Sequence, residues 1–212
     1  AELLQSYVET YLEEEIRKEA IVKQIGPFGR FLELAALNSG QITNFTSISK
    51  EVGLSPAAIR NYYETLEQTL IAERVEPITR SSSRKKLTKS NRYLFFDLGV
   101  ARVAGRESTH YIPARKGQIF EQFIGLELIK LCHQLNPTAR LRFWRDPDGP
   151  EVDWVLEADG RFLPIEVKLG PNPDISDTKH LSVFAGEYSN SEPGIVICTS
   201  ERKLKFSNGI IA

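Results

Sequence analysis

The sequence predicts a mixed chain, α/β in class and α+β overall, in which a winged helix-turn-helix module precedes an α/β domain. Three observations support this fold class. Apolar residues recur at helical spacing through most of the first 71 positions, strand candidates at 71–78 and 92–99 flank a basic turn, and a long apolar helix at 116–135 precedes alternating strand and helix patterns. We therefore expect an N-terminal linker or docking helix over 1–24, the winged helix over 25–98 and the α/β domain over 99–212.

The composition limits the classes of protein to consider. With 212 residues, of which 41% are hydrophobic, the chain can form one large core or two small ones. Its net charge of −1 means that any contact with nucleic acid depends on a local basic patch. Cys132 and Cys198 are too far apart in sequence for a disulfide framework or a zinc knuckle, and no apolar run is long enough to span a membrane. We therefore expect a cytoplasmic protein without membrane contact.

The first helix is expected over residues 3–25, which contain neither Pro nor Gly. Its apolar stripe includes Leu4, Tyr7, Tyr11 and Leu12. This stripe either packs on the winged helix or docks on another domain as an assembly element.

Residues 28–71 have the pattern of a helix-turn-helix. One amphipathic helix is expected over 28–39, a short one over 45–53, and a third from Ser55-Pro56 to about Ile71. Ser is a good N-cap and Pro suits the first helical turn. A short helix, a Gly-Leu-Ser turn and a longer helix are typical of a helix-turn-helix, and the two strands that follow complete a winged helix.

The turn between those strands is strongly basic. Residues 77–96 include no acidic side chain and six basic ones: Arg80, Arg84, Lys85, Lys86, Lys89 and Arg92. Such a patch suits contact with phosphates, and Arg60 on the third helix could reach a groove. Glu64 and Glu67 follow one turn later and would repel phosphates. The alternatives are therefore a solvated hairpin or a module that binds protein.

The second module is expected beyond Gly99. Its helix at 116–135 is apolar around most of its circumference, as a buried helix is. Strand candidates follow at 140–146, 151–160, 161–170 and 194–200, with a helix near 176–188. A Pro-Asp-Gly-Pro turn at 147–150 would pair the first two strands, and we expect Trp144 and Trp154 beside it to lie in the core.

Four residues of this module suggest chemistry. Glu121 lies within the apolar helix, Asp153 on one strand, and Glu166 and Lys168 on the next. Asp on one strand followed by Glu-x-Lys on the next is a nuclease signature. Paired carboxylates gather a hard ion such as Mg²⁺, which activates a water and stabilises charge on a phosphate. A lysine beside them can orient or deprotonate the water, or offset the phosphate charge.

The simpler interpretation of Glu166 and Lys168 is a surface ion pair, because residues i and i+2 share one face of a strand. An ion pair does not account for Asp153 one strand earlier or for Glu121 in an apolar helix. Crowded carboxylates without a cation would also raise one another's pKa values. We therefore predict that the four residues form one site for Mg²⁺ or Mn²⁺.

Nearly the whole chain resembles the C-terminal region of prokaryotic AAA-type ATPases, a domain of unknown function. The stretches that carry the resemblance are residues 28–71, 92–105, 116–130, 143–156 and 164–170. The resemblance implies a winged helix followed by a restriction-endonuclease-like α/β/α domain of the PD-(D/E)xK type with a central mixed sheet. It also implies an upstream P-loop ATPase domain, whereas this sequence has no Gly-x-x-x-x-Gly-Lys-Ser/Thr.

By position in that family's motif, Glu121 matches the helical acid, Asp153 the metal aspartate, Glu166 the second ligand and Lys168 the catalytic lysine. The Glu151-Val152 pair before Asp153 departs from the Pro-Asp pairing that names the fold. The resemblance thus implies a Mg²⁺-dependent nuclease that binds DNA. The alternative is a non-catalytic module with the same fold that binds DNA or a protein for the ATPase.

Overall fold

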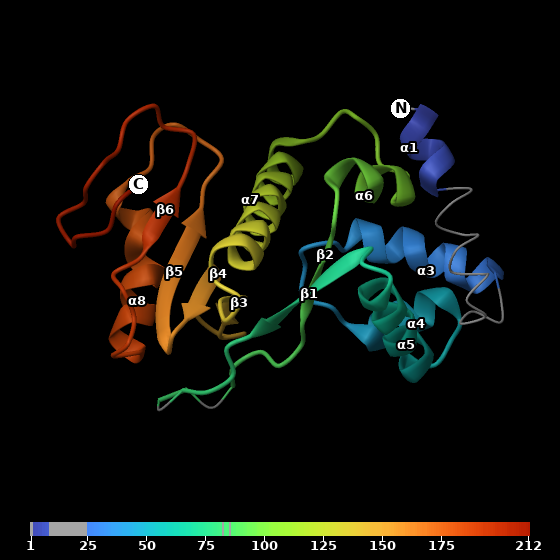
Figure 1. The fold of residues 1–212 in the computed structure, drawn as a ribbon, viewed down its shortest axis with the longest axis horizontal. Coiled ribbons are helices and arrows are strands. Elements are labelled where there is room, and N and C mark those ends of the chain that lie inside the picture. Colours follow the sequence, from blue (N-terminus) through green and yellow to red (C-terminus); the bar gives the residue numbers. More distant parts are fainter. Residues whose placement is uncertain (1, 9–24, 82, 85) are drawn as a thin grey trace. The chain divides into compact units, whose positions relative to one another are not determined.

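The computed structural model describes residues 2–8, 25–81, 83–84 and 86–212. The chain divides into two compact units (Figure 1), residues 1–74 with 92–111 and residues 75–91 with 112–212. Each unit has its own cluster of buried apolar side chains.

The strands form one six-stranded sheet in the order β2-β1-β3-β4-β5-β6. Their bounds are β1 Ala72–Pro77, β2 Arg92–Phe95, β3 Arg140–Arg145, β4 Glu151–Ala158, β5 Arg161–Val167 and β6 Ile195–Ile197. Strands β3, β4 and β5 pair antiparallel, whereas β1 with β3 and β5 with β6 pair parallel. The expected strands and the mixed sheet are therefore confirmed.

The helices of the first unit are α1 (Glu2–Ser6), α3 (Ile25–Leu37), α4 (Phe45–Val52), α5 (Pro56–Gln68) and α6 (Leu98–Ala104). Most of the long helix expected over 3–25, including Tyr11 and Leu12, lies outside the described residues. The three helices expected between 28 and 71 are confirmed as elements, and the winged-helix assignment stays a prediction.

Local chemistry fixes both ends of α5. At its start the Ser55 hydroxyl accepts a hydrogen bond from Ala58 N at 3.2 Å, with Pro56 in the first turn. The helix ends at Gln68 rather than near Ile71, because Leu70 adopts a positive φ of 59°. The inner face of α5 carries Tyr63, whose ring packs edge-to-face on Phe31 with centroids 5.0 Å apart.

The second unit packs two helices on opposite sides of strands β3–β5, namely α7 (Pro113–Leu135) and α8 (Lys179–Glu187), the latter preceded by the short 3₁₀ helix η2 (Ile175–Thr178) (Figure 1). Both tryptophans are fully buried, as expected for core residues. The Trp154 indole N–H donates to the carbonyl of Glu121 on α7 at 3.1 Å. The ring of Trp144 packs edge-to-face on Phe184 of α8, with centroids 5.4 Å apart.

The segment 75–91 groups with the second unit, whereas we had expected it within a module ending at residue 98. The amide of Ile78 donates to the carbonyl of Phe143 at 2.8 Å, and that of Thr88 donates to the carbonyl of Arg145 at 3.0 Å. Ile78 and Leu87 also enter the core around Trp144. These contacts to β3, which is distant in sequence, bind the segment to the second unit.

None of the helices in the described part of the chain is both long and apolar enough to cross a membrane.

Gly194 is the glycine on which the placement of β6 depends. Its φ is +104°, and a Cβ atom there would lie 2.9 Å from the carbonyl oxygen of Pro164 on β5. We expect Gly194→Ala to lower the free energy of unfolding by roughly 2–3 kcal/mol, since it combines an unfavourable φ with a backbone collision. Urea denaturation measures this loss. Gly209→Ala is the matched control, because Gly209 also has a positive φ, +85°, but open space around its Cβ position; equal losses would contradict the role of the collision.

Candidate active site

A cavity of about 490 Å³ lies where α7 begins, β4 begins and β5 ends in the second unit. All four residues that the sequence singled out line it. The lining residues are Pro113, Ala114, Lys116, Gly117, Gln118, Glu121, Glu151, Asp153, Glu166, Val167, Lys168 and Leu169. The cavity therefore gathers acidic and basic side chains from one helix and two neighbouring strands.

Backbone hydrogen bonds hold the acids of β4 and α7 at this cavity. The Asp153 carboxylate accepts a hydrogen bond from the amide of Val167 at 2.8 Å, which joins the start of β4 to the end of β5. One residue further along β4, the indole of Trp154 binds the carbonyl of Glu121. Because Trp154 is fully buried, this contact fixes the turn of α7 that carries Glu121.

Glu166 and Lys168 form an ion pair at the wall of the cavity. Lys168 Nζ lies 2.8 Å from Glu166 Oε1, and the two side chains are 43% and 9% exposed respectively. The other carboxylate oxygen, Glu166 Oε2, is buried and has no hydrogen-bond partner among the residues that the structure describes. A buried carboxylate oxygen without a hydrogen bond costs free energy. The ion pair with Lys168 therefore compensates only part of the cost of burying Glu166.

The same environment makes Glu166 a weak acid. Burial, followed by the nearby charge of Asp153, raises the pKa of Glu166 to about 7, against the opposing effect of Lys168. Burial acts to lower the pKa of Lys168, but the hydrogen bond and charge of Glu166, with Asp153 and Asp177, raise it overall. Near neutral pH, therefore, Lys168 is charged whereas Glu166 is partly protonated.

The donors of this cavity fit a hard divalent cation. In the part of the chain that the structure describes, no three His, Cys, Asp or Glu side chains are grouped closely enough to hold a metal. Mg²⁺ often binds through one or two carboxylates and keeps waters as its remaining ligands. A cation beside Asp153 and Glu166 would relieve their mutual repulsion and would satisfy the unpaired Oε2 of Glu166.

Sequence reasoning missed three polar residues of this cavity, Lys116, Gln118 and Glu151. Glu151 pairs with Arg145 across the β3–β4 turn, with 2.9 Å between Nη1 and Oε2, and its charge adds to the raised pKa of Glu166. Its position two residues before Asp153 on the same strand was the available signal. Lys116 and Gln118 had none, because their place depends on where α7 begins.

Several of the predicted phosphate-binding residues are engaged within the chain. Arg84 binds Asp146 at 2.7 Å, lies 3.9 Å from Glu187, and stacks over the ring of Trp144. Lys86 pairs with Asp148 at 3.3 Å. Arg92 is buried with only 5% exposure, and Arg60 lies over the ring of Phe45.

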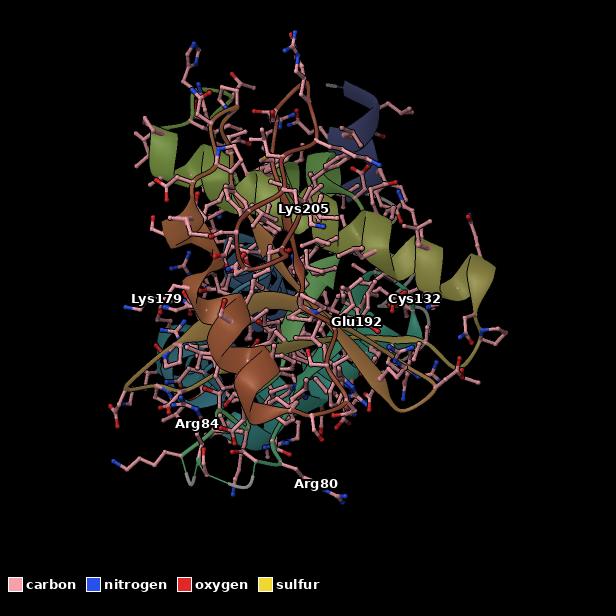
Figure 2. All side chains as sticks on the ribbon, turned by 90° about the vertical axis from the view of Figure 1, so that its left-hand side faces the viewer. Arg80, Arg84, Cys132, Lys179, Glu192 and Lys205 are labelled. Atoms are coloured by element: carbon pink, nitrogen blue, oxygen red, sulfur yellow. The ribbon has the colours of Figure 1, made fainter. Side chains whose placement is uncertain are left out.

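Other members of that predicted set remain on the surface. Arg80 and Lys89 are exposed, and Arg80 lies with Arg84 on the loop beside the end of α8 (Figure 2). Lys85 is outside the described residues. Contact between this set and phosphates stays a prediction, with fewer side chains available for it.

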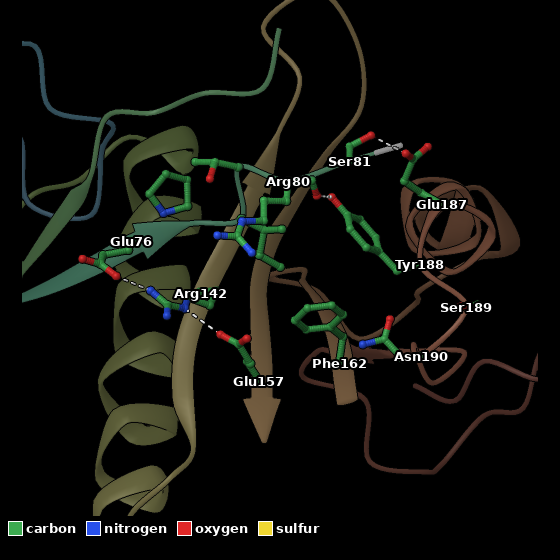
Figure 3. Close-up of a pocket in the computed structure, with 13 residues that line it drawn as sticks. Glu76, Arg80, Ser81, Arg142, Glu157, Phe162, Glu187, Tyr188, Ser189 and Asn190 are labelled. Atoms are coloured by element: carbon green, nitrogen blue, oxygen red, sulfur yellow. Dashed lines mark hydrogen bonds and ion pairs between the residues drawn. The ribbon is translucent and has the colours of Figure 1, made fainter. Parts of the chain in front are cut away.

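A second, larger cavity of about 690 Å³ lies between the end of β1, β3 and the end of α8. Arg142 is held there between Glu76 and Glu157 (Figure 3). The Tyr188 hydroxyl donates to the carbonyl of Arg80 at 2.8 Å. Three charged groups of this cavity, Glu76, Arg142 and Glu157, thus pair with one another, and none of its described side chains is a buried polar group without a partner.

Comparisons with known proteins give family matches without an activity. Two family models match, each described as a domain of unknown function: DUF8612 over residues 1–110 and DUF4143 over residues 116–212. Uncharacterized proteins of Mycobacterium tuberculosis and Mycobacterium bovis are each 22% identical over 171 residues. These matches cover 80% of this chain and 38% of each relative, so the chain spans well under half the length of the relatives. No solved structure gives a significant match.

The raised pKa of Glu166 predicts a pH dependence of stability. An unfolded glutamate has a pKa of about 4.3, whereas that of folded Glu166 is about 7, so the folded state holds the proton more tightly. Its contribution to stability is thus complete below about pH 4.3 and is lost as pH rises to about 7. At pH 8 we expect the free energy of unfolding of Glu166→Gln to exceed that of wild type by roughly 1–3 kcal/mol. This difference should shrink toward pH 4.

The measurement is urea unfolding across this pH range in buffer with a chelator, which keeps the carboxylates free of metal. Glu127→Gln is the control, because Glu127 lies on the same unit in an exposed pair with Lys130. A wild-type minus variant difference that is the same at pH 4 and pH 8 would show that Glu166 is not a weakened acid.

Proposed function

The chain belongs to the DUF8612 family, a domain of unknown function, and we therefore propose its activity from the site itself: a Mg²⁺-dependent phosphodiesterase that cleaves nucleic acid. One observation carries the proposal. Asp153 on β4 and the pair Glu166 and Lys168 at the end of β5 line one cavity. In it a buried oxygen of the Glu166 carboxylate has no hydrogen-bond partner among the described residues. This arrangement is unfavourable by itself and becomes favourable beside a cation.

Asp153 and Glu166 would hold the metal, with Glu121 binding it directly or through water. When bound, Mg²⁺ or Mn²⁺ would lower the pKa of a bound water and offset the charge of a phosphate. The protein supplies the rigid placement of these acids, because Asp153 is bound to the amide of Val167 and Glu121 lies at the turn fixed by Trp154.

Lys168 is the proposed catalytic lysine. Its ammonium has three donors, and the ion pair with Glu166 Oε1 occupies one of them. The remaining donors can bind a phosphate oxygen or orient the attacking water. The raised pKa of Lys168 keeps it charged at neutral pH, which favours stabilisation of negative charge over removal of a proton from water.

The start of α7 adds a favourable environment for a phosphate. The N-cap residue Ile112 makes no side-chain hydrogen bond to the first turn, and the N-terminal end of a helix carries a partial positive charge that favours an anion. Pro113, Ala114 and the exposed Lys116 of that turn line the cavity. A phosphodiester in the cavity would therefore face positive charge from both α7 and Lys168.

A P-loop ATPase domain upstream of this chain is part of the proposal, on the basis of the resemblance described above. The chain covers 38% of its mycobacterial relatives, whose remaining length can hold a further domain. The nuclease site would then act on nucleic acid that such an ATPase moves or remodels.

The alternative is a non-catalytic module that binds nucleic acid or protein. It is favoured by the Glu166–Lys168 ion pair, which already compensates part of the buried charge, and by the lack of a third close ligand among the described residues. In that case Mg²⁺ would not bind, and the thermal unfolding midpoint would be the same with and without it.

Cleavage assays separate the two functions. Labelled single- and double-stranded DNA and RNA are incubated with wild type, Asp153→Ala or Lys168→Ala in Mg²⁺ or Mn²⁺. We expect each variant to cleave at least about 100-fold more slowly than wild type. Asp153→Ala removes a metal ligand, and Lys168→Ala removes the positive charge that would contact the phosphate. Circular dichroism confirms that the variants are folded.

Asp148→Ala and Lys130→Ala are the matched controls, since both residues carry the same charges in exposed pairs on the same unit. They should cleave at the wild-type rate. Equal cleavage by wild type, Asp153→Ala and Lys168→Ala would identify a contaminating nuclease and would refute the assignment.

A further inference from the structure

Three exposed basic side chains follow strand β6 of the sheet. Arg202, Lys203 and Lys205 lie on the stretch that leads from β6 into a C-terminal hairpin at 204–212, and all three are exposed. Among the residues that the structure describes, they form no ion pair within 4.0 Å. We call these three side chains the C-terminal basic group; Glu201 is the one acidic neighbour in this stretch.

The hairpin that carries this group is firmly anchored. Leu204 and Ala212 exchange two backbone hydrogen bonds of 2.9 Å each, and the amide of Phe206 donates to the carbonyl of Ile210 at 2.9 Å. Ile210 is 1% exposed and belongs to the core of the second unit, against which Phe206 also packs. The hairpin therefore presents its outward side chains from a rigid base.

The basic side chains of this stretch point away from the core. Phe206 packs against the core of the second unit, whereas Lys205 beside it and Lys203 two residues earlier are exposed. Residues two apart in a strand are separated by about 6.6 Å. Lys203 and Lys205 thus form a short row of positive charge that can follow a nucleic-acid backbone.

This row is connected to the candidate active site by the backbone. The amide of Lys168 donates to the carbonyl of Ile197 at 2.9 Å, and that of Thr199 donates to the carbonyl of Gly170 at 3.0 Å. Residues 197–199 therefore lie beside residues 168–170, directly after β5, and the basic stretch begins three residues later, at Arg202. At its far side, Asn208 Nδ2 donates to Thr178 Oγ1 at 2.8 Å, which places the hairpin turn next to the exposed Lys179.

Figure 2 looks onto this side of the second unit and labels Lys179 and Lys205. In this view Lys205 lies in the upper part, the loop with Arg80 and Arg84 lies at the bottom, and Lys179 lies between them. Arg84 is bound to Asp146, and Lys205 lies apart from the basic residues of this loop.

We propose that the C-terminal basic group, with Lys179, is the surface that binds the nucleic-acid backbone and leads it to the cavity at Lys168. The proposal rests on the proposed nuclease function for its biological meaning, and it concerns binding rather than cleavage. It assigns the phosphate contacts to residues 202–205 in place of the segment 80–92.

The test is fluorescence anisotropy with a labelled single-stranded DNA oligonucleotide, in a chelator so that no cleavage occurs, over a NaCl series. Arg202→Gln/Lys203→Gln/Lys205→Gln should bind at least about tenfold more weakly than wild type at low salt. Its plot of log K against log salt should be less steep by about 2, because each lost phosphate contact on a single strand lowers the slope by about 0.7.

Lys130→Gln/Arg140→Gln/Arg161→Gln removes the same number of charges from exposed positions of the same unit and is the matched control. It should bind as wild type does. The proposal is overturned if wild type does not bind, if the C-terminal triple variant keeps the wild-type affinity and slope, or if the control loses as much as that variant. Thermal unfolding confirms that both triple variants are folded.

Asp153→Asn distinguishes a failure of this proposal from a failure of the proposed function. If Asp153→Asn cleaves at the wild-type rate, the nuclease site is refuted, whereas the proposed binding surface is not affected. Loss of cleavage in Asp153→Asn together with unchanged binding by the C-terminal triple variant would refute the binding surface alone.

Discussion

The buried carboxylate of Glu166 is the constraint on which the second unit depends. A pKa raised from 4.5 to about 7 corresponds to roughly 3 kcal/mol against the ionised form. Apolar burial in the same unit offsets this cost, because Trp144, Trp154 and Ile165 are completely buried and burial of an Ile side chain alone contributes about 1.5–3 kcal/mol. The charge of Asp153 on the neighbouring strand β4 adds to this cost. A stable core thus supports an arrangement of acids that is unfavourable until a cation or a proton arrives.

The elements with local signals were predictable from the sequence, and so was the gathering of the four polar residues. Alternation along 151–158 and 161–167, with a turn between 145 and 151, defined β3, β4 and β5 and therefore brought Asp153 and Glu166 to neighbouring strands. The family matches agree with the expected domain of unknown function and do not address the finer nuclease assignment.

What the sequence could not reveal depends on contacts between distant residues. The basic segment at 80–92 has the composition of a solvated turn, and nothing local indicates that Arg84 binds Asp146 or that Ile78 pairs with Phe143. The position at which α5 ends was not predictable, because Leu70 takes a positive φ and a leucine in the sequence does not indicate this conformation. Lys116 lies in the first turn of α7, which begins at Pro113, three residues before the expected start, and it lines the cavity there.

The second unit is discontinuous in sequence, since residues 75–91 and 112–212 belong to it and 92–111 do not. A fragment cut at the start of the DUF4143 match, residue 116, would lack the first turn of α7 as well as Ile78 and Leu87 from the core. It would expose the apolar surface that these side chains cover and leave Asp146 without Arg84. During synthesis, residues 75–91 likewise emerge before the strands on which they pack, so this unit completes its folding only after its C-terminal half has been made. The two family boundaries therefore do not mark parts that can be separated and studied alone.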